Sequence, residues 1–164
     1  MNPIEKYFTA ERWWCTGGMA LGFLATAVAL YCLLKIKQPY YNGLAWVLLV
    51  LGLFFFIICI GVFLRSPKDV ARVHAVIEHD AAQLKQEELP RMERVMRTFK
   101  VIMVAEVSLL VLSVVMIWFV PVPPVWKGAF VGVLIMATLL LAFDYLADKR
   151  GAEYLEFLKA QVPV

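Results

Sequence analysis

The sequence predicts an all-α fold: a polytopic membrane protein whose four transmembrane helices form two hairpins, joined by a cytoplasmic helical connector. Two observations concern composition and length. The 164 residues are 62% hydrophobic and only 18% charged, which is too apolar for a soluble domain. Four apolar stretches each approach the ~20 residues that cross a bilayer at 1.5 Å per residue. They occupy residues 13–34, 43–64, 101–120 and 126–146.

The distribution of basic residues is the third observation, and it predicts the orientation. Thirteen of the sixteen Lys and Arg residues fall on one side of the four spans, and the loops on the other side hold only Lys35, Lys37 and Lys127. Because positive charge is retained on the cytoplasmic side, we expect both termini and the segment 65–100 to lie in the cytoplasm. The expected segments are an N-terminus (1–12), hairpin one (13–64), the connector (65–100), hairpin two (101–146) and a C-terminal tail helix (147–164).

The first span resembles a secretory signal at its start. Lys6 and Arg12 precede an apolar run with a small-x-small pattern at 25–27. The run continues to Leu34, which is longer than a typical signal core, so we expect it to remain as a span. Tryptophans lie near the span ends, among them Trp14 at the inner interface, as in the aromatic belts of membrane proteins.

Residues at the turns and at the basic ends of the two hairpins repeat at a constant sequence offset. Residues 39–43 (PYYNG) align with 124–128 (PVWKG), and the same offset aligns Arg65 with Arg150. A real duplication would place a pseudo-two-fold axis along the membrane normal, whereas the alternative is that any two helical hairpins need similar turns and basic ends. Small residues spaced four apart favour close helix packing. They occur at Gly18, Gly22, Gly128 and Gly132.

The connector is the only sizeable polar element, and its sequence predicts a helical hairpin. Ser66 and Pro67 carry helix-start signals, a capping residue followed by a proline at the first helical position. Residues 80–83 would cap a second helix after a turn at His79. Pro90 then begins an amphipathic segment that is expected to run continuously into the third span.

An apolar stripe follows Pro90 at positions i, i+3, i+4 and i+7. It consists of Met92, Val95, Met96 and Phe99. The stripe could lie on lipid, on the bundle or on a partner, and it is the candidate partner-binding face. In the tail, Tyr154 and Leu158 indicate a short helix that could dock on the connector.

Two acidic residues are the candidates for an intramembrane polar site. Glu106 lies six residues beyond Lys100, or ~9 Å along a helix, and Asp144 lies six residues before Arg150. The two carboxyl groups should therefore meet at one level. A charge at such depth costs roughly 2.5 to 3.5 kcal/mol, so it usually pairs, protonates or serves function. The pair could be a proton or cation site, could join Arg97, Lys100 or Arg150 in a structural network, or could bind a basic group of a partner.

Other chemistries have little support in the sequence. His74 and His79 are about 140° apart on a continuous helix, which does not suit a shared metal ion. The three cysteines, all within spans, have no metal-ligand spacing and are expected to pack as small apolar residues. No nucleophile-base set or phosphate loop is evident, and no basic stripe is left for nucleic acid. We expect a non-enzymatic protein without cofactor or metal.

The connector sequence EELPRMERVMRTF and the tail sequence DYLADKRGAEYLEFL resemble those of a group of small bacterial inner-membrane proteins. The topology is similar to that of four-helix immunity proteins, which protect bacteria from pore-forming toxins. The resemblance implies a binding protein of the bacterial inner membrane whose partners are membrane lipid and a toxin or other membrane protein. One alternative is a small transporter or channel, either monomeric or a homo-oligomer, that uses Glu106 and Asp144. The other is an accessory subunit of a membrane complex.

Overall fold

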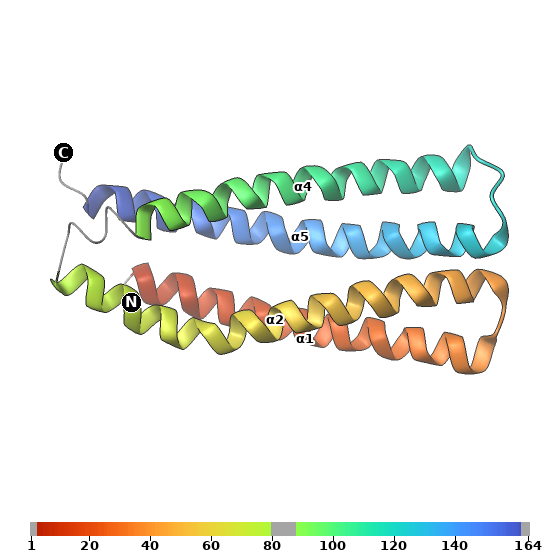
Figure 1. Cartoon of the computed structure of the whole chain (residues 1–164), viewed down its shortest axis with the longest axis horizontal. Coiled ribbons are helices and arrows are strands. Elements are labelled where there is room, and N and C mark those ends of the chain that lie inside the picture. Colours follow the sequence, from red (N-terminus) through yellow and green to blue (C-terminus); the bar gives the residue numbers. More distant parts are fainter. Residues whose placement is uncertain (1–2, 80–87, 162–164) are drawn as a thin grey trace.

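The computed structural model describes residues 3–79 and 88–161, and every regular element in these ranges is helical (Figure 1). The long helices are α1 (Pro3–Tyr31), α2 (Pro39–His79), α4 (Leu89–Trp118) and α5 (Pro124–Gln161), and a short π-helical segment, η1 (Cys32–Ile36), extends α1. Over the described ranges, four helices are long and apolar enough to cross a membrane. The predicted fold class, an all-α protein with four helices long and apolar enough to span a membrane, is confirmed.

The four helices form two hairpins that lie side by side (Figure 1). The first consists of α1 and α2 and the second of α4 and α5, and the two hairpin turns lie at the same end of the bundle. Most contacts between the hairpins join α2 to α5, so these two helices form the centre of the bundle. Helix α4 packs mainly on α5 and leaves the rest of its surface toward the surroundings.

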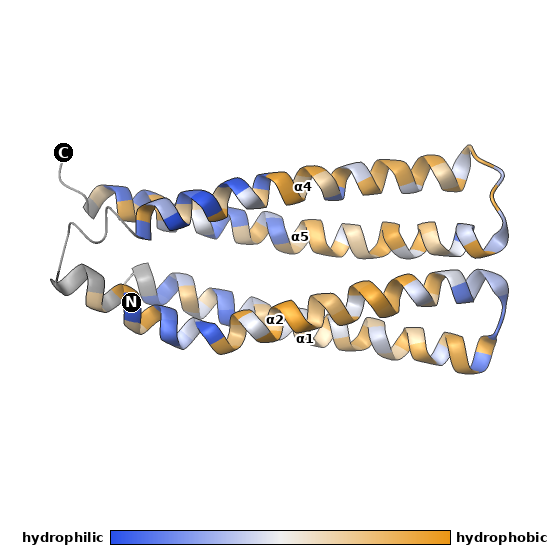
Figure 2. Cartoon of the chain, in the orientation of Figure 1, coloured by the Kyte–Doolittle hydropathy of each residue, from blue (hydrophilic) through white to orange (hydrophobic). Residues whose placement is uncertain are grey.

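Hydropathy divides the bundle along its length (Figure 2). Hydrophilic residues gather where α1 begins and α5 ends, which we call the polar end, and apolar residues dominate from there toward the turns. At 41 residues α2 is about 60 Å long, roughly twice the thickness of the hydrocarbon core of a bilayer. The helices are therefore long enough to span a membrane and to continue as a bundle outside it at the polar end.

Near the turns, α2 and α5 cross in backbone contact at two glycines. A Cβ atom on Gly43 would collide with the carbonyl oxygen of Val125, and one on Gly128 would collide with the carbonyl oxygen of Tyr40. Gly43 and Gly128 are equivalent at the offset that aligns the two hairpins, and so are Tyr40 and Val125. Each contact is thus the symmetry mate of the other, as at an isologous interface.

A third contact lies on the same pseudo-two-fold axis. A Cβ atom on Gly132 would lie 2.9 Å from the Cβ atom of Val47, its own equivalent at the same offset. A residue that touches its own equivalent marks the axis itself. The crossing has the symmetry that a duplicated hairpin would produce, and glycine is needed there because only a residue without a side chain allows this backbone approach.

The polar end contains its own hydrophobic core, to which all four helices contribute. Tyr7 stacks on Tyr154 with ring centroids 4.6 Å apart. Tyr154 and Leu158 of the tail share this core with Met92 and Met96, so the tail of α5 docks on the segment that begins α4. The buried residues of this core are Phe8, Val73, Met92, Met96, Tyr154 and Leu158.

The expected start of a helix at Ser66 and Pro67 is wrong, because α2 continues through both residues. Proline in a helix interior removes one hydrogen bond and costs ~3 kcal/mol or more. Here the Ser66 hydroxyl is buried and donates a hydrogen bond to the carbonyl oxygen of Phe8, 3.3 Å away, and further along the helix Val73 enters the polar-end core. This packing holds α2 helical across Pro67. The expected cap at residues 80–83 lies outside the described residues.

Candidate intramembrane carboxyl site

Glu106 lies on the narrow face of α4 that is directed into the bundle. Its exposed fraction is 6%, whereas Val104 and Val107 beside it are 67% and 46% exposed. Ser113, seven residues further and therefore on the same face, is fully buried. Helix α4 thus buries two polar residues against α5 and leaves a largely apolar surface outside, which is the arrangement expected of a helix at the edge of a membrane bundle.

Asp144 comes from α5 and lies at the same level. Its carboxyl group is within hydrogen-bonding reach of the Glu106 carboxyl, as the equal depths of the two residues predict. One carboxyl oxygen of Glu106, Oε2, is buried and accepts no hydrogen bond from the described part of the chain.

Two cysteines extend this polar level across the bundle. The thiols of Cys15 on α1 and Cys59 on α2 are within hydrogen-bonding reach of each other, and Cys59 is within electrostatic range of Asp144. Gly18 makes room for this arrangement, since a Cβ atom there would lie 2.5 Å from the Cys59 sulfur. Each helix therefore contributes one side chain to a polar layer, which we define as Cys15, Cys59, Asp144 and Glu106.

The expected role of the cysteines as small apolar residues omits the part that Cys15 and Cys59 take in this layer, although Cys59 is indeed buried. One signal was available, because Cys59 and Asp144 are equivalent at the offset that relates the hairpin turns.

The structure does not bring the three candidate cations to the carboxyl pair. In the two described ranges, no ion pair joins Glu106 or Asp144 to a Lys or Arg. Arg97 and Lys100 are exposed, and Arg150 lies over the Trp14 ring, 5.4 Å from its centroid. Because the helix makes one turn in 3.6 residues, Arg97 lies on the opposite side of α4 from Glu106 and Lys100 lies about a third of a turn away. The carboxyl pair is consequently uncompensated by any cation within the described chain.

The candidate partner-binding face is largely inside the protein. Met92 is fully buried and Met96 is 8% exposed, both in the polar-end core, while Val95 and Phe99 are half-buried at its edge. A Cβ atom on Gly151 of α5 would lie 2.6 Å from the Met96 sulfur, so this glycine makes the space that the methionines fill. The interpretation of the stripe as a partner face is therefore wrong for Met92 and Met96, which pack on the bundle.

A buried ionic cluster lies beside that core. Glu88 is 1% exposed and accepts a hydrogen bond at 2.9 Å from Nε of Arg91 and a second from the same guanidinium. Arg72 of α2 lies 3.1 Å away, and the Tyr154 hydroxyl donates at 3.4 Å. Burial raises the pKa of Glu88, but the hydrogen bonds and charges of the two arginines outweigh it and hold that pKa below its usual range. The cluster ties α2, α4 and α5 together at the polar end.

No protein-family model, curated protein or solved structure matches this chain. The described residues contain no group of His, Cys, Asp and Glu suited to a metal ion. The side chains of His74 and His79 lie outside the described ones.

Proposed function

We propose that this protein is a non-enzymatic binding protein of the bacterial inner membrane, whose partner is another membrane protein. The observation that carries the proposal is the Glu106–Asp144 pair, which lies in the apolar part of the bundle without a cation from the described chain. Acidic residues inside membrane helices are costly and are usually kept for function. The similarity of the topology to that of four-helix immunity proteins makes a membrane-active toxin the leading candidate partner.

The buried Oε2 oxygen of Glu106, which accepts no hydrogen bond from the described chain, supplies the chemistry of recognition. A buried acceptor without a hydrogen-bond partner costs about 1–3 kcal/mol. A hydrogen-bond donor or a basic side chain on an incoming helix would recover that free energy when the Glu106 carboxyl turns from the bundle interior toward that helix. Such a donor is worth more inside the membrane than at the surface, because water does not compete for the acceptor there.

The surface beside Glu106 suits a helical partner. A shallow groove lined by Met103, Val107 and Leu141 runs between α4 and α5, and Lys100 lies at its border. Met103 and Val107 flank Glu106 at spacings of three and one residues, so the groove is at the level of the carboxyl pair. Because α4 has little contact with helices other than α5, a partner helix could approach it laterally from the lipid.

The test is protection from killing in a bacterial host. The gene is co-expressed with the toxin gene of its own genomic neighbourhood, and survival and co-purification are measured. Wild type should protect, and Glu106→Gln and Asp144→Asn should each lower protection by about tenfold. The matched control is Thr138→Val, which removes one polar group from the exposed face of the α5 span. Absence of both protection and co-purification with the wild-type chain would refute the proposal.

A transporter is the second candidate, and the polar layer favours it. Cys15 interacts with Cys59, Cys59 is within electrostatic range of Asp144, and Asp144 interacts with Glu106, so polar groups follow one another across the bundle. Toward the turns, however, the α2 and α5 backbones touch at Gly43 and Gly128, so a path between these helices would require them to separate. Flux into proteoliposomes distinguishes the two functions: transport predicts a flux above the leak of empty vesicles that Glu106→Gln abolishes.

A further inference from the structure

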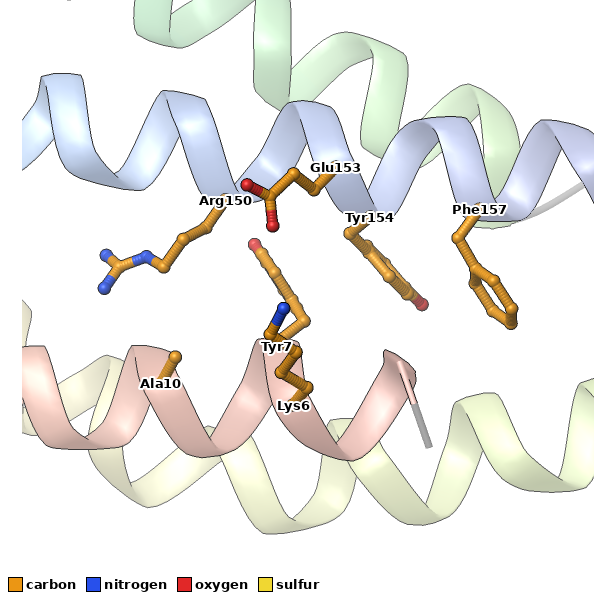
Figure 3. A pocket seen from close by; sticks show the side chains of 7 residues that line it. All are labelled: Lys6, Tyr7, Ala10, Arg150, Glu153, Tyr154 and Phe157. Carbon is orange, nitrogen blue, oxygen red and sulfur yellow. The ribbon is translucent and has the colours of Figure 1, made fainter. Parts of the chain in front are cut away.

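A cavity of about 340 Å³ lies between α1 and α5 at the polar end of the bundle (Figure 3). Two of its lining residues are basic, Lys6 from α1 and Arg150 from α5, and one is acidic, Glu153. Aromatic rings form much of the remaining wall. They belong to Tyr7, Tyr154 and Phe157. The walls are thus mainly apolar and carry a net positive charge of one.

The cavity lies at the depth where lipid headgroups are expected. Arg150 is in cation–π contact with Trp14, and tryptophans of the aromatic belt sit at the headgroup level. Lys6 precedes Trp14 by eight residues, or ~12 Å along α1 on the polar side. The two cations therefore border the zone in which the phosphates of the adjacent leaflet lie, while the apolar surface continues from Trp14 toward the hydrocarbon.

Arg150 has a buried hydrogen-bond donor without an acceptor in the described chain. Its Nη1 atom is buried and forms no hydrogen bond among the described residues. Glu153 lines the same cavity but makes no ion pair with Arg150 in the described chain. In Figure 3 the Arg150 guanidinium extends to one end of the space, and the Lys6 ammonium and the Glu153 carboxylate point into its middle. A planar guanidinium with an unused N–H group is well suited to bind a phosphate oxygen.

We propose that this cavity binds the phosphate headgroup of an anionic phospholipid. Arg150 donates from Nη1 to a phosphate oxygen, and Lys6 adds a second positive charge that also balances Glu153. The acyl chains then leave past Trp14 along the apolar surface of α1 and α5. Basic pockets between membrane helices on the positively charged side recognise anionic headgroups in this manner. The apolar walls favour a lipid over free phosphate, which has no apolar part to bury.

The experiment is native mass spectrometry of the full chain in mild detergent, titrated with phosphatidylglycerol, phosphatidylcholine or inorganic phosphate. We expect one phosphatidylglycerol adduct per chain at occupancies about tenfold above those of phosphatidylcholine. Arg150→Gln should lower this occupancy about tenfold, Lys6→Gln about threefold, and Arg150→Lys less than Arg150→Gln. The matched control is Lys149→Gln, which removes one positive charge from the exposed neighbour of Arg150 and should leave binding unchanged.

Three results would overturn the proposal. Equal occupancy of the two lipids would show that the headgroup charge is not recognised, and an equal loss in Lys149→Gln would show a diffuse charge effect. Displacement of the lipid by millimolar inorganic phosphate would assign the cavity to free phosphate instead. Lys6 is exposed and tolerates substitution, so the Lys6→Gln result decides the matter if Arg150→Gln does not fold. None of these readouts depends on a toxin, so they test the lipid-binding cavity independently of the proposed function.

Discussion

Replacing Gly43 by alanine should destabilise the bundle through the α2–α5 crossing alone. The new Cβ atom would lie 2.8 Å from the carbonyl carbon of Val125 and 3.0 Å from the amide nitrogen of Ala129, and closer still to the Val125 oxygen. Ordinary contact begins at 3.4 Å, so the helices must separate by more than half an ångström. Overpacking of this kind costs about 1–3 kcal/mol, while alanine recovers up to ~1 kcal/mol in helix propensity. The net loss should be about 1–2 kcal/mol.

The pseudo-two-fold axis makes a sharper prediction. Gly128→Ala creates the same collision with Tyr40 and should cost the same as Gly43→Ala within experimental error. The double variant should cost clearly less than the sum, because the first alanine has already moved the helices apart. The losses in unfolding free energy at two independent sites would add. The difference between the double variant and the sum of the single variants therefore measures whether the two glycines form one crossing.

The measurement is reversible unfolding in mixed detergent micelles, followed by circular dichroism. Gly61→Ala is the matched control, since Gly61 lies in the same helix and a Cβ atom there meets nothing within 4 Å. It should be neutral or stabilising by up to ~1 kcal/mol. If Gly43→Ala proves as stable as Gly61→Ala, or if the double variant is additive, the crossing of α2 and α5 at these glycines is refuted.

Two further predictions concern the polar end. Glu88→Gln should destabilise the fold by about 2 kcal/mol at neutral pH, below the ~3–5 kcal/mol of a fully buried pair because Arg72 and Arg91 remain partly exposed and solvated. Since folding lowers the Glu88 pKa, its contribution is present at neutral pH and is lost as pH falls below about 4, so thermal melts of wild type and variant should converge there. Gly151→Ala should change stability by less than about 1 kcal/mol, because the flexible tips of Met92 and Met96 can move, whereas Gly151→Leu should cost about 1–3 kcal/mol in the same melts.

Much of the fold is predictable because bilayer length and apolar composition are local properties. Four spans follow from the length of the apolar runs, and the start of α4 near Pro90 follows from proline at a first helical turn. Local rules failed at Pro67, where a helix-start signal lies inside α2. The helix continues there because Val73 enters the polar-end core and Ser66 bonds to α1, and a contact between residues 58 positions apart leaves no trace in a local pattern.

The carboxyl site was predictable in depth but not in its neighbours. Counting residues from Lys100 and Arg150 placed Glu106 and Asp144 at one level, and the structure brings them together. Counting residues did not reveal that Arg97, Lys100 and Arg150 lie away from the carboxyl pair. To predict this, the angle of each residue around its helix is needed as well as its distance along the helix. Cys59 belongs to the polar layer because α2 is the helix that packs against α5. Hydrophobicity does not predict which helices pack together, because all four spans are apolar.

The two hairpins meet at one crossing but differ in the residues at the level of the carboxyl pair. This difference allows the role of the pair in folding to be tested separately from its role in function. At the offset that aligns them, hairpin one has Leu21 where hairpin two has Glu106, and Cys59 where it has Asp144. Hairpin one therefore packs at this level without a carboxyl pair. The double variant Glu106→Leu/Asp144→Cys should accordingly fold with wild-type or greater stability, since removing buried polar groups is often stabilising, while losing protection or flux. A variant that fails to fold would show that the pair is structural, and the proposed function would lose its premise.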